Sequence, residues 1–167
     1  MGASGYRQGL NIYTDGACST NGTWDSAAAI CVYVDEQAIY KHGNFLGKAT
    51  NNIAELEAFK MGLEFLNRPI HYPRIVNIIS DSAYIVNCFN QKWYENWEKN
   101  NWITSSKTPV KNKELWIDII KLYRDLKQHY DITIIKTEGH ANDKFNNEVD
   151  HLAVYCKNNR ANHTEEI

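Results

Sequence analysis

Apolar residues gather into runs of strand length in the first third of the chain. Such runs cover residues 10–18, 27–34 and 38–46, and the polar residues 35–37 separate the last two. Short apolar or alternating runs bounded by turn residues are typical of strands. We therefore predict three consecutive strands that pair as an antiparallel meander.

The rest of the chain changes to helical spacing, interrupted by two further strand patterns. Apolar residues recur at helical spacing across residues 52–67, and Pro69 stops that pattern. The near-continuous apolar run at residues 75–80 predicts a strand that is covered on both faces. The further predicted elements are a helix from residue 81 or 82 to about 91, a helix over 115–126, a strand over 131–137 and a helix over about 146–157.

The order of these elements indicates the fold class. Three antiparallel strands followed by α/β units predict an α/β protein with one mixed, five-stranded sheet and helices on both faces. Residues 1–9 lack periodicity, so we predict a disordered N-terminal extension. Residues 10–158 are expected to form a single domain, and the polar residues 159–167 a frayed C-terminal tail.

Composition narrows the class of protein further. The chain has 167 residues, 43% of them hydrophobic and 23% charged, which is typical of a soluble globular domain. No stretch has the length of a membrane span or the pattern of a signal peptide, and the four cysteines lack metal-binding spacing, so we expect free thiols and a cytoplasmic location. A net charge of -2 means that any nucleic-acid binding must come from a local patch.

Four acidic residues occupy informative places in this pattern: Asp15, Glu55, Asp81 and Asp150. Asp15 ends one apolar run and Asp81 follows another, and sites in such sheets gather at the carboxyl ends of strands. Isolated buried carboxylates are costly, and a divalent cation is the usual compensation. Each residue alone is also compatible with a common structural role. Asp15 fits a turn, Asp81 a helix N-cap, Glu55 an acid in the first turn of a helix and Asp150 the surface of a helix.

Five short motifs bring these acids into a known order. They are YTDGAC at 13–18, TNNIAEL at 50–56, SDS at 80–82, GHA at 139–141 and VDHLA at 149–153. In this order and spacing, the chain resembles the type 1 ribonuclease H family over about residues 10–157. The resemblance implies a ribonuclease H fold and an endonuclease that hydrolyses the RNA strand of RNA–DNA hybrids by two-metal-ion catalysis, leaving 5′-phosphate and 3′-hydroxyl ends.

The resemblance also implies roles for particular residues. Asp15, Glu55, Asp81 and Asp150 match the family's catalytic metal-binding carboxylates, which would hold two Mg²⁺ ions, with Mn²⁺ as an alternative. His140 matches a mobile catalytic histidine near the scissile phosphate, although a polar loop residue is its ordinary reading. The chain is expected to act as a monomer on RNA–DNA hybrid, with no membrane partner.

Substrate contacts follow from the same resemblance. Residues that match positions meeting the RNA strand are Cys18, Asn21, Asn51 and Asn52, while Thr50 and Asn96 match contacts to DNA phosphate. Residues 92–113 resemble the family's basic protrusion, with Trp93, Trp97, Lys99, Lys107 and Lys111 as candidate contacts to the DNA strand. In the ordinary reading of this segment, the tryptophans belong to the core and the lysines to a solvated face.

Some positions leave alternatives open. The loop at residues 19–25 lacks the Gly/Pro-rich composition frequent in bacterial members, so its backbone path is not set by the resemblance. Glu148 is compatible with metal or proton traffic and equally with a solvated helix start. Rival functions are a 3′–5′ exonuclease or resolvase of the same fold, and a non-catalytic hybrid-binding module.

Overall fold

One mixed sheet forms the centre of the protein. The computed structural model describes residues 8–137 and 143–167. The sheet has six strands in the order β5-β4-β1-β2-β3-β6. The strands are β1 (Leu10–Cys18), β2 (Asp25–Val34), β3 (Gln37–Lys48), β4 (Ile75–Ser80), β5 (Asp131–Lys136) and β6 (His163–Glu166).

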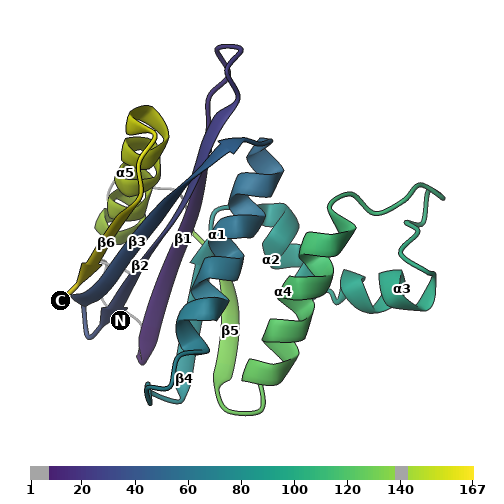
Figure 1. Cartoon of the computed structure of the whole chain (residues 1–167). Coiled ribbons are helices and arrows are strands. Elements are labelled where there is room, and N and C mark those ends of the chain that lie inside the picture. The colour runs from purple at the N-terminus through teal and green to yellow at the C-terminus, as the bar shows by residue number, and fades with distance from the viewer. Residues whose placement is uncertain (1–7, 138–142) are drawn as a thin grey trace.

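Strands β1, β2 and β3 form the predicted antiparallel meander, and β4 and β5 extend it in parallel from β1. The helices are α1 (Asn51–Leu66), α2 (Ala83–Asn90), α3 (Trp93–Lys99), α4 (Lys113–Leu126) and α5 (Lys144–Asn159). Figure 1 shows α5 alone on one face of the sheet and α1 on the other, with α4 outside α1. Within the described residues, no helix is long and apolar enough to span a membrane.

Alternation along the strands divides the core into two layers. In β1, Ile12 faces the layer under α1, whereas Tyr13 faces the layer under α5. The α5 layer is built on aromatic rings, with Phe145 of α5 packed 4.3 Å from Tyr33 of β2 between ring centroids. This arrangement confirms the predicted α/β class with helices on both faces.

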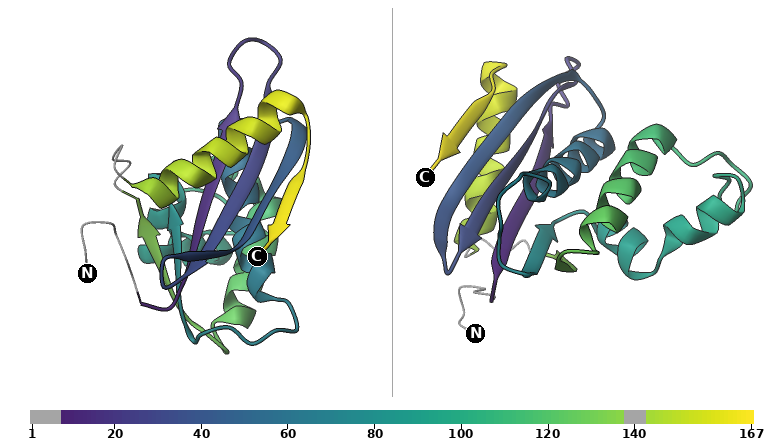
Figure 2. Two further views of the ribbon diagram at one scale, coloured as in Figure 1. Left: turned by 90° about the vertical axis from the view of Figure 1, so that its left-hand side faces the viewer. Right: turned by 60° about the horizontal axis from the view of Figure 1, so that its bottom comes forward.

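The structure corrects the sequence prediction in three places. The sheet has six strands and not five, because residues 163–166 of the tail that we expected to be frayed pair with β3 as β6. A short helix, α3, forms within residues 92–113, here called the Lys/Trp segment, and projects beside α4, as the views in Figure 2 also show. Asp15 lies inside β1 and not at its end.

Candidate active site

Strand β1 extends beyond its parallel pairing with β4, and this places Asp15 next to the other acids. The parallel pairing of β1 with β4 ends at Tyr13 and Ile79. Asp15 therefore lies just beyond the paired region, and Asp81 directly follows the last residue of β4. The two carboxylates meet where the parallel part of the sheet ends, although Asp15 itself sits in a longer strand.

Helix α1 brings Glu55 to the same place. Thr50 caps the helix by accepting a hydrogen bond from the Ile53 amide at 3.2 Å, so the chain turns into α1 directly above β1. Glu55 then accepts a hydrogen bond from the backbone N–H of Gly16 at 3.1 Å. As a result, one carboxylate oxygen from each of Asp15, Glu55 and Asp81 lies within 4.8 Å of the others.

The fourth predicted carboxylate joins this group from α5. Asp150 lies beside Asp15, and its charge and side-chain contact both raise the pKa of Asp15. Asp15 and Glu55 are buried, whereas Asp81 and Asp150 are exposed. Three of the predicted acids therefore form one close group and Asp150 lies beside it, whereas His140 lies outside the described residues.

Burial and mutual repulsion disfavour the charged forms of the two buried acids. The pKa of Asp15 is raised to about 8, first by burial and then by the charge of Asp81 and the contacts of Asp150. The pKa of Glu55 is raised to about 10, first by burial and then by the charges of Asp81 and Asp15. A hard divalent cation prefers carboxylate oxygens and would offset this repulsion, so the donor set fits such an ion.

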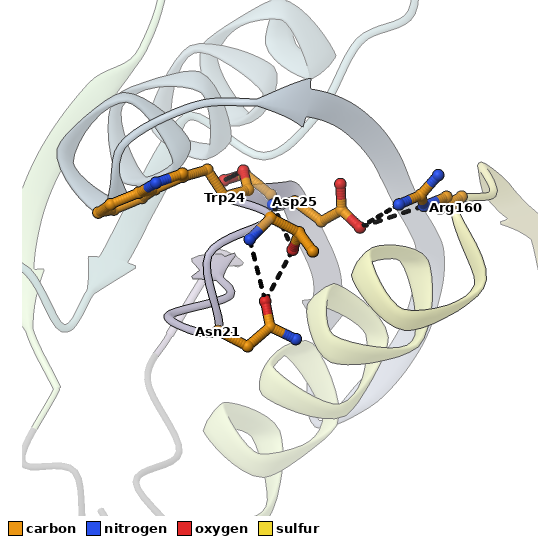
Figure 3. Close-up of polar contacts among 6 residues, drawn as sticks. Asn21, Trp24, Asp25 and Arg160 are labelled. Atoms are coloured by element: carbon orange, nitrogen blue, oxygen red, sulfur yellow. Dashed lines mark hydrogen bonds and ion pairs between the residues drawn. The ribbon is translucent and has the colours of Figure 1, made fainter.

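The hairpin between β1 and β2 has a defined path despite its unusual composition. Asn21 closes a turn by accepting hydrogen bonds from the backbone N–H and the hydroxyl of Thr23, at 3.2 and 2.8 Å. Asp25 then pairs with Arg160 at the end of α5 at 3.0 Å, while the exposed indole of Trp24 points to the opposite side (Figure 3). Cys18 donates a hydrogen bond to the Ala49 carbonyl at 3.2 Å, which joins the hairpin to the start of α1.

Several of the predicted substrate-binding residues are exposed to solvent. Exposed positions include Asn21 and the α1 start at Thr50, Asn51 and Asn52. A surface groove of about 590 Å³ runs from Asn52 to Lys111 on the loop before α4. Asn52 of α1 and residues of the segment 92–113 therefore line the same groove.

Part of the Lys/Trp segment belongs to the hydrophobic core. Trp97 is buried and packs against Trp102 and Trp116, with ring centroids 5.9 and 5.4 Å apart, so its burial favours the packing role that the sequence left open. Trp93 is half-buried and donates a hydrogen bond to Gln91 at 3.0 Å. The exposed members are Asn96, Lys99, Lys107 and Lys111.

Sequence reasoning did not find the residues that support the site. Gly16 lies within the motif at residues 13–18, but nothing in the sequence marks it as the donor to Glu55, or Tyr33 and Lys41 as partners of Glu148. Their roles follow from strand register and helix placement. All four cysteines are free, as predicted.

Comparison with known proteins agrees with this geometry. Residues 7–157 match the family model described as RNase H. The chain belongs to the ribonuclease H family. The ribonuclease H of Clostridium botulinum (strain Hall) is 43% identical over 145 residues, covering 85% of this chain and 91% of the relative. The ribonuclease H of Caldanaerobacter subterraneus subsp. tengcongensis is 41% identical over 146 residues, covering 87% and 88%.

Solved ribonuclease H structures share the fold. The solution structure of the PFV RNase H domain superposes with a TM-score of 0.73 at 26% identity, covering 94% of this chain and 98% of that domain. LC9-RNase H1, described as a type 1 RNase H, gives a TM-score of 0.78 at 19% identity over 97% of this chain and 79% of its own, which shows the fold alone.

Proposed function

We propose that this chain is an endonuclease that hydrolyses the RNA strand of RNA–DNA hybrids and leaves 5′-phosphate and 3′-hydroxyl ends. The observation that carries the proposal is the close group of Asp15, Glu55 and Asp81, with Asp150 beside Asp15, where the parallel pairing of β1 with β4 ends. A foamy viral protease-reverse transcriptase structure in complex with RNA/DNA hybrid matches 87% of this chain at 26% identity and a TM-score of 0.73, although the match covers only 19% of that larger protein. The ribonuclease H relatives support the same substrate class.

The four carboxylates would hold two Mg²⁺ ions, with Mn²⁺ as an alternative. Bound there, the ions would lower the pKa of the attacking water and stabilise the attacking and leaving oxygens at phosphorus. The chain prepares the site before any ion binds: the Gly16 N–H orients the Glu55 carboxylate, and burial restricts the movement of Asp15. His140 would give a proton to the leaving oxygen or assist product release.

The substrate would lie across the carboxylates and along the groove. Cys18, Asn21, Asn51 and Asn52 surround the path of the RNA strand in this proposal, and the polar groups among them would contact ribose 2′-hydroxyls, which distinguish RNA from DNA. Thr50, Asn96, Trp93 and the lysines Lys99, Lys107 and Lys111 would hold the DNA strand, mainly through its phosphates. The buried Trp97 would support this surface from beneath. The enzyme would act as a cytoplasmic monomer.

A single gel tests the proposed function. Labelled RNA–DNA hybrid, double-stranded RNA and double-stranded DNA are each incubated with and without Mg²⁺, and the Asp81→Asn protein serves as the inactive control. We expect Mg²⁺-dependent cleavage of the hybrid's RNA strand, little cutting of double-stranded RNA and none of double-stranded DNA. Comparable cutting of DNA would favour the exonuclease or resolvase reading, and binding without cleavage would favour a non-catalytic module.

A further inference from the structure

Glu148 is tied to the sheet, although it lies near the exposed start of α5. The Tyr33 hydroxyl of β2 donates a hydrogen bond to Glu148 Oε1 at 2.5 Å. The Lys41 ammonium of β3 lies 3.5 Å from the other carboxylate oxygen, Oε2. Tyr33 is only 1% exposed, so the hydroxyl that holds Glu148 is fixed by the core. These contacts rule out a freely solvated side chain at this position.

Glu148 and Asp150 lie on opposite flanks of the same helix. Two residues along an α-helix correspond to a rotation of roughly 200°. Glu148 accordingly contacts β2 and β3, whereas Asp150 lies beside Asp15 of β1 and raises its pKa. A small rotation of α5 about its axis would therefore loosen both contacts together.

The packing between these flanks does not by itself set that rotation. Phe145, Val149, Ala153 and Cys156 bury the underside of α5 against the sheet. Apolar burial is non-directional and tolerates small rotations of a helix, whereas a hydrogen bond has a preferred geometry. The directional contacts of Glu148 supply the constraint that the apolar contacts lack.

We propose that Tyr33, Glu148 and Lys41 form a positioning latch that fixes the rotation of α5 and so holds Asp150 against Asp15. None of the three touches the carboxylate cluster in this assignment; they act through Asp150. The inference rests on the proposed function only in taking Asp150 as a ligand of the divalent ion. It assigns Glu148 to positioning and not to metal binding or proton traffic.

The test compares variants by their Mg²⁺ affinity in the absence of substrate, measured by calorimetric titration. Tyr33→Phe keeps the ring and removes only the donor, and Glu148→Ala removes the acceptor. Residues that orient metal ligands typically change metal affinity by ~10- to 100-fold, and we expect about 10-fold weaker Mg²⁺ binding for each variant. The double variant should be no weaker than either single one, because both changes remove the same hydrogen bond.

Glu148→Gln separates positioning from direct metal binding. The amide oxygen of glutamine still accepts from Tyr33, so this variant should keep most of the wild-type Mg²⁺ affinity. If Glu148 bound the ion through its charge, Glu148→Gln would lose affinity as Glu148→Ala does, and the proposal would be overturned. Tyr123→Phe, which alters a tyrosine of α4 on the other side of the sheet, is the matched control for loss of a hydroxyl.

Kinetics supply a second readout. In Tyr33→Phe the maximal rate should recover at high Mg²⁺, and the Michaelis constant for hybrid should stay near its wild-type value. Unchanged Mg²⁺ affinity in Tyr33→Phe, with a lowered melting temperature alone, would show a purely structural contact and sink the proposal. Failure of the wild-type protein to cut hybrid would count against the proposed function, whereas the Mg²⁺ titrations would still decide the latch.

Discussion

The backbone N–H of Gly16 donates a hydrogen bond to the carboxylate of Glu55 at 3.1 Å, directly beside Asp15. This contact requires α1 to approach β1 very closely. A Cβ atom on Gly16 would lie 2.5 Å from the Ala54 carbonyl carbon and 2.6 Å from the Glu55 nitrogen, both in the backbone. Glycine at this position therefore allows the two buried acids to share one site.

Replacing Gly16 with alanine should push α1 away from β1. We expect a loss of about 1–3 kcal/mol in the free energy of unfolding, as for other overpacked sites, together with at least ~10-fold slower cleavage because Glu55 moves with the helix. Chemical denaturation and hybrid cleavage measure the two effects.

Gly62→Ala is the matched control in the same helix–sheet interface. Its Cβ would meet side-chain methyl groups of Ile12 at 3.1 Å and Thr14 at 3.4 Å but no backbone atom, and alanine favours a helix, so the loss should be much smaller than for Gly16→Ala. Equal behaviour of the two variants would show that the close approach at Gly16 is not needed.

Replacing Asp15 with asparagine should abolish cleavage while the fold is kept. The substitution replaces a buried carboxyl, whose charged form burial and Asp81 disfavour, with a neutral amide, so thermal stability without metal should hold or rise. Cleavage assays with Mg²⁺ and thermal unfolding with a chelator check both statements. Substantial Mg²⁺-dependent activity in this variant would contradict the metal-ligand role.

The metal-free protein should lose stability as pH rises. Asp15 and Glu55 have native pKa values of about 8 and about 10, above their unfolded values of roughly 4. Above pH ~4 the native state therefore binds more protons than the unfolded state, so the free energy of unfolding falls, with the Asp15 contribution lost by about pH 8. Denaturation at several pH values with a chelator should show this slope, and Asp15→Asn should reduce it. A wild-type slope in Asp15→Asn would contradict the assignment of the slope to this residue.

Replacing Lys99, Lys107 and Lys111 together with alanine should weaken hybrid binding more than chemistry. Each real phosphate contact contributes close to one unit to the slope of log K against log salt, so this slope should flatten. The Michaelis constant should rise while maximal turnover is largely kept. Binding is best measured in an Asp81→Asn background with Ca²⁺, and an unchanged slope would place the DNA strand elsewhere.

Replacing His140 with alanine should slow turnover without ending it. A positioned acid or base contributes about 10²- to 10⁴-fold, and we expect the low end if bound metal ions carry much of the charge stabilisation. Mg²⁺ affinity should stay near the wild-type value. Full turnover near neutral pH would contradict a catalytic role for His140.

Local sequence patterns identified the acidic residues but not the residues that hold them in position. Asp81 could be placed because a strand covered on both faces ends just before it, and motif order joined Glu55 and Asp150 to it. Asp15 was expected at a strand end, since the sequence does not reveal that β1 outlasts its pairing with β4. The contact of Tyr33 with Glu148 spans 115 residues of chain, and only the assembled sheet and helix bring the two together.

The Lys/Trp segment shows another limit. Its tryptophans fit both a nucleic-acid surface and a core, and composition cannot separate the two. The burial of Trp97 depends on Trp116 of α4, which follows it by 19 residues through an irregular loop. The polar sequence of residues 163–166 hid a strand for a related reason: its pairing with β3 depends on backbone groups and not on apolar side chains.

Strand β6 covers an edge of the sheet through which two molecules of this protein would otherwise be able to pair. It pairs with β3 from Tyr40 to Gly43, where β3 would otherwise present unpaired backbone groups to another chain. The new border is only four residues long and carries Glu165 and Glu166, and Arg68 holds Glu166 at 2.5 Å. A short, acidic border is a poor template for a further strand, so these last residues protect the sheet against edge-to-edge aggregation.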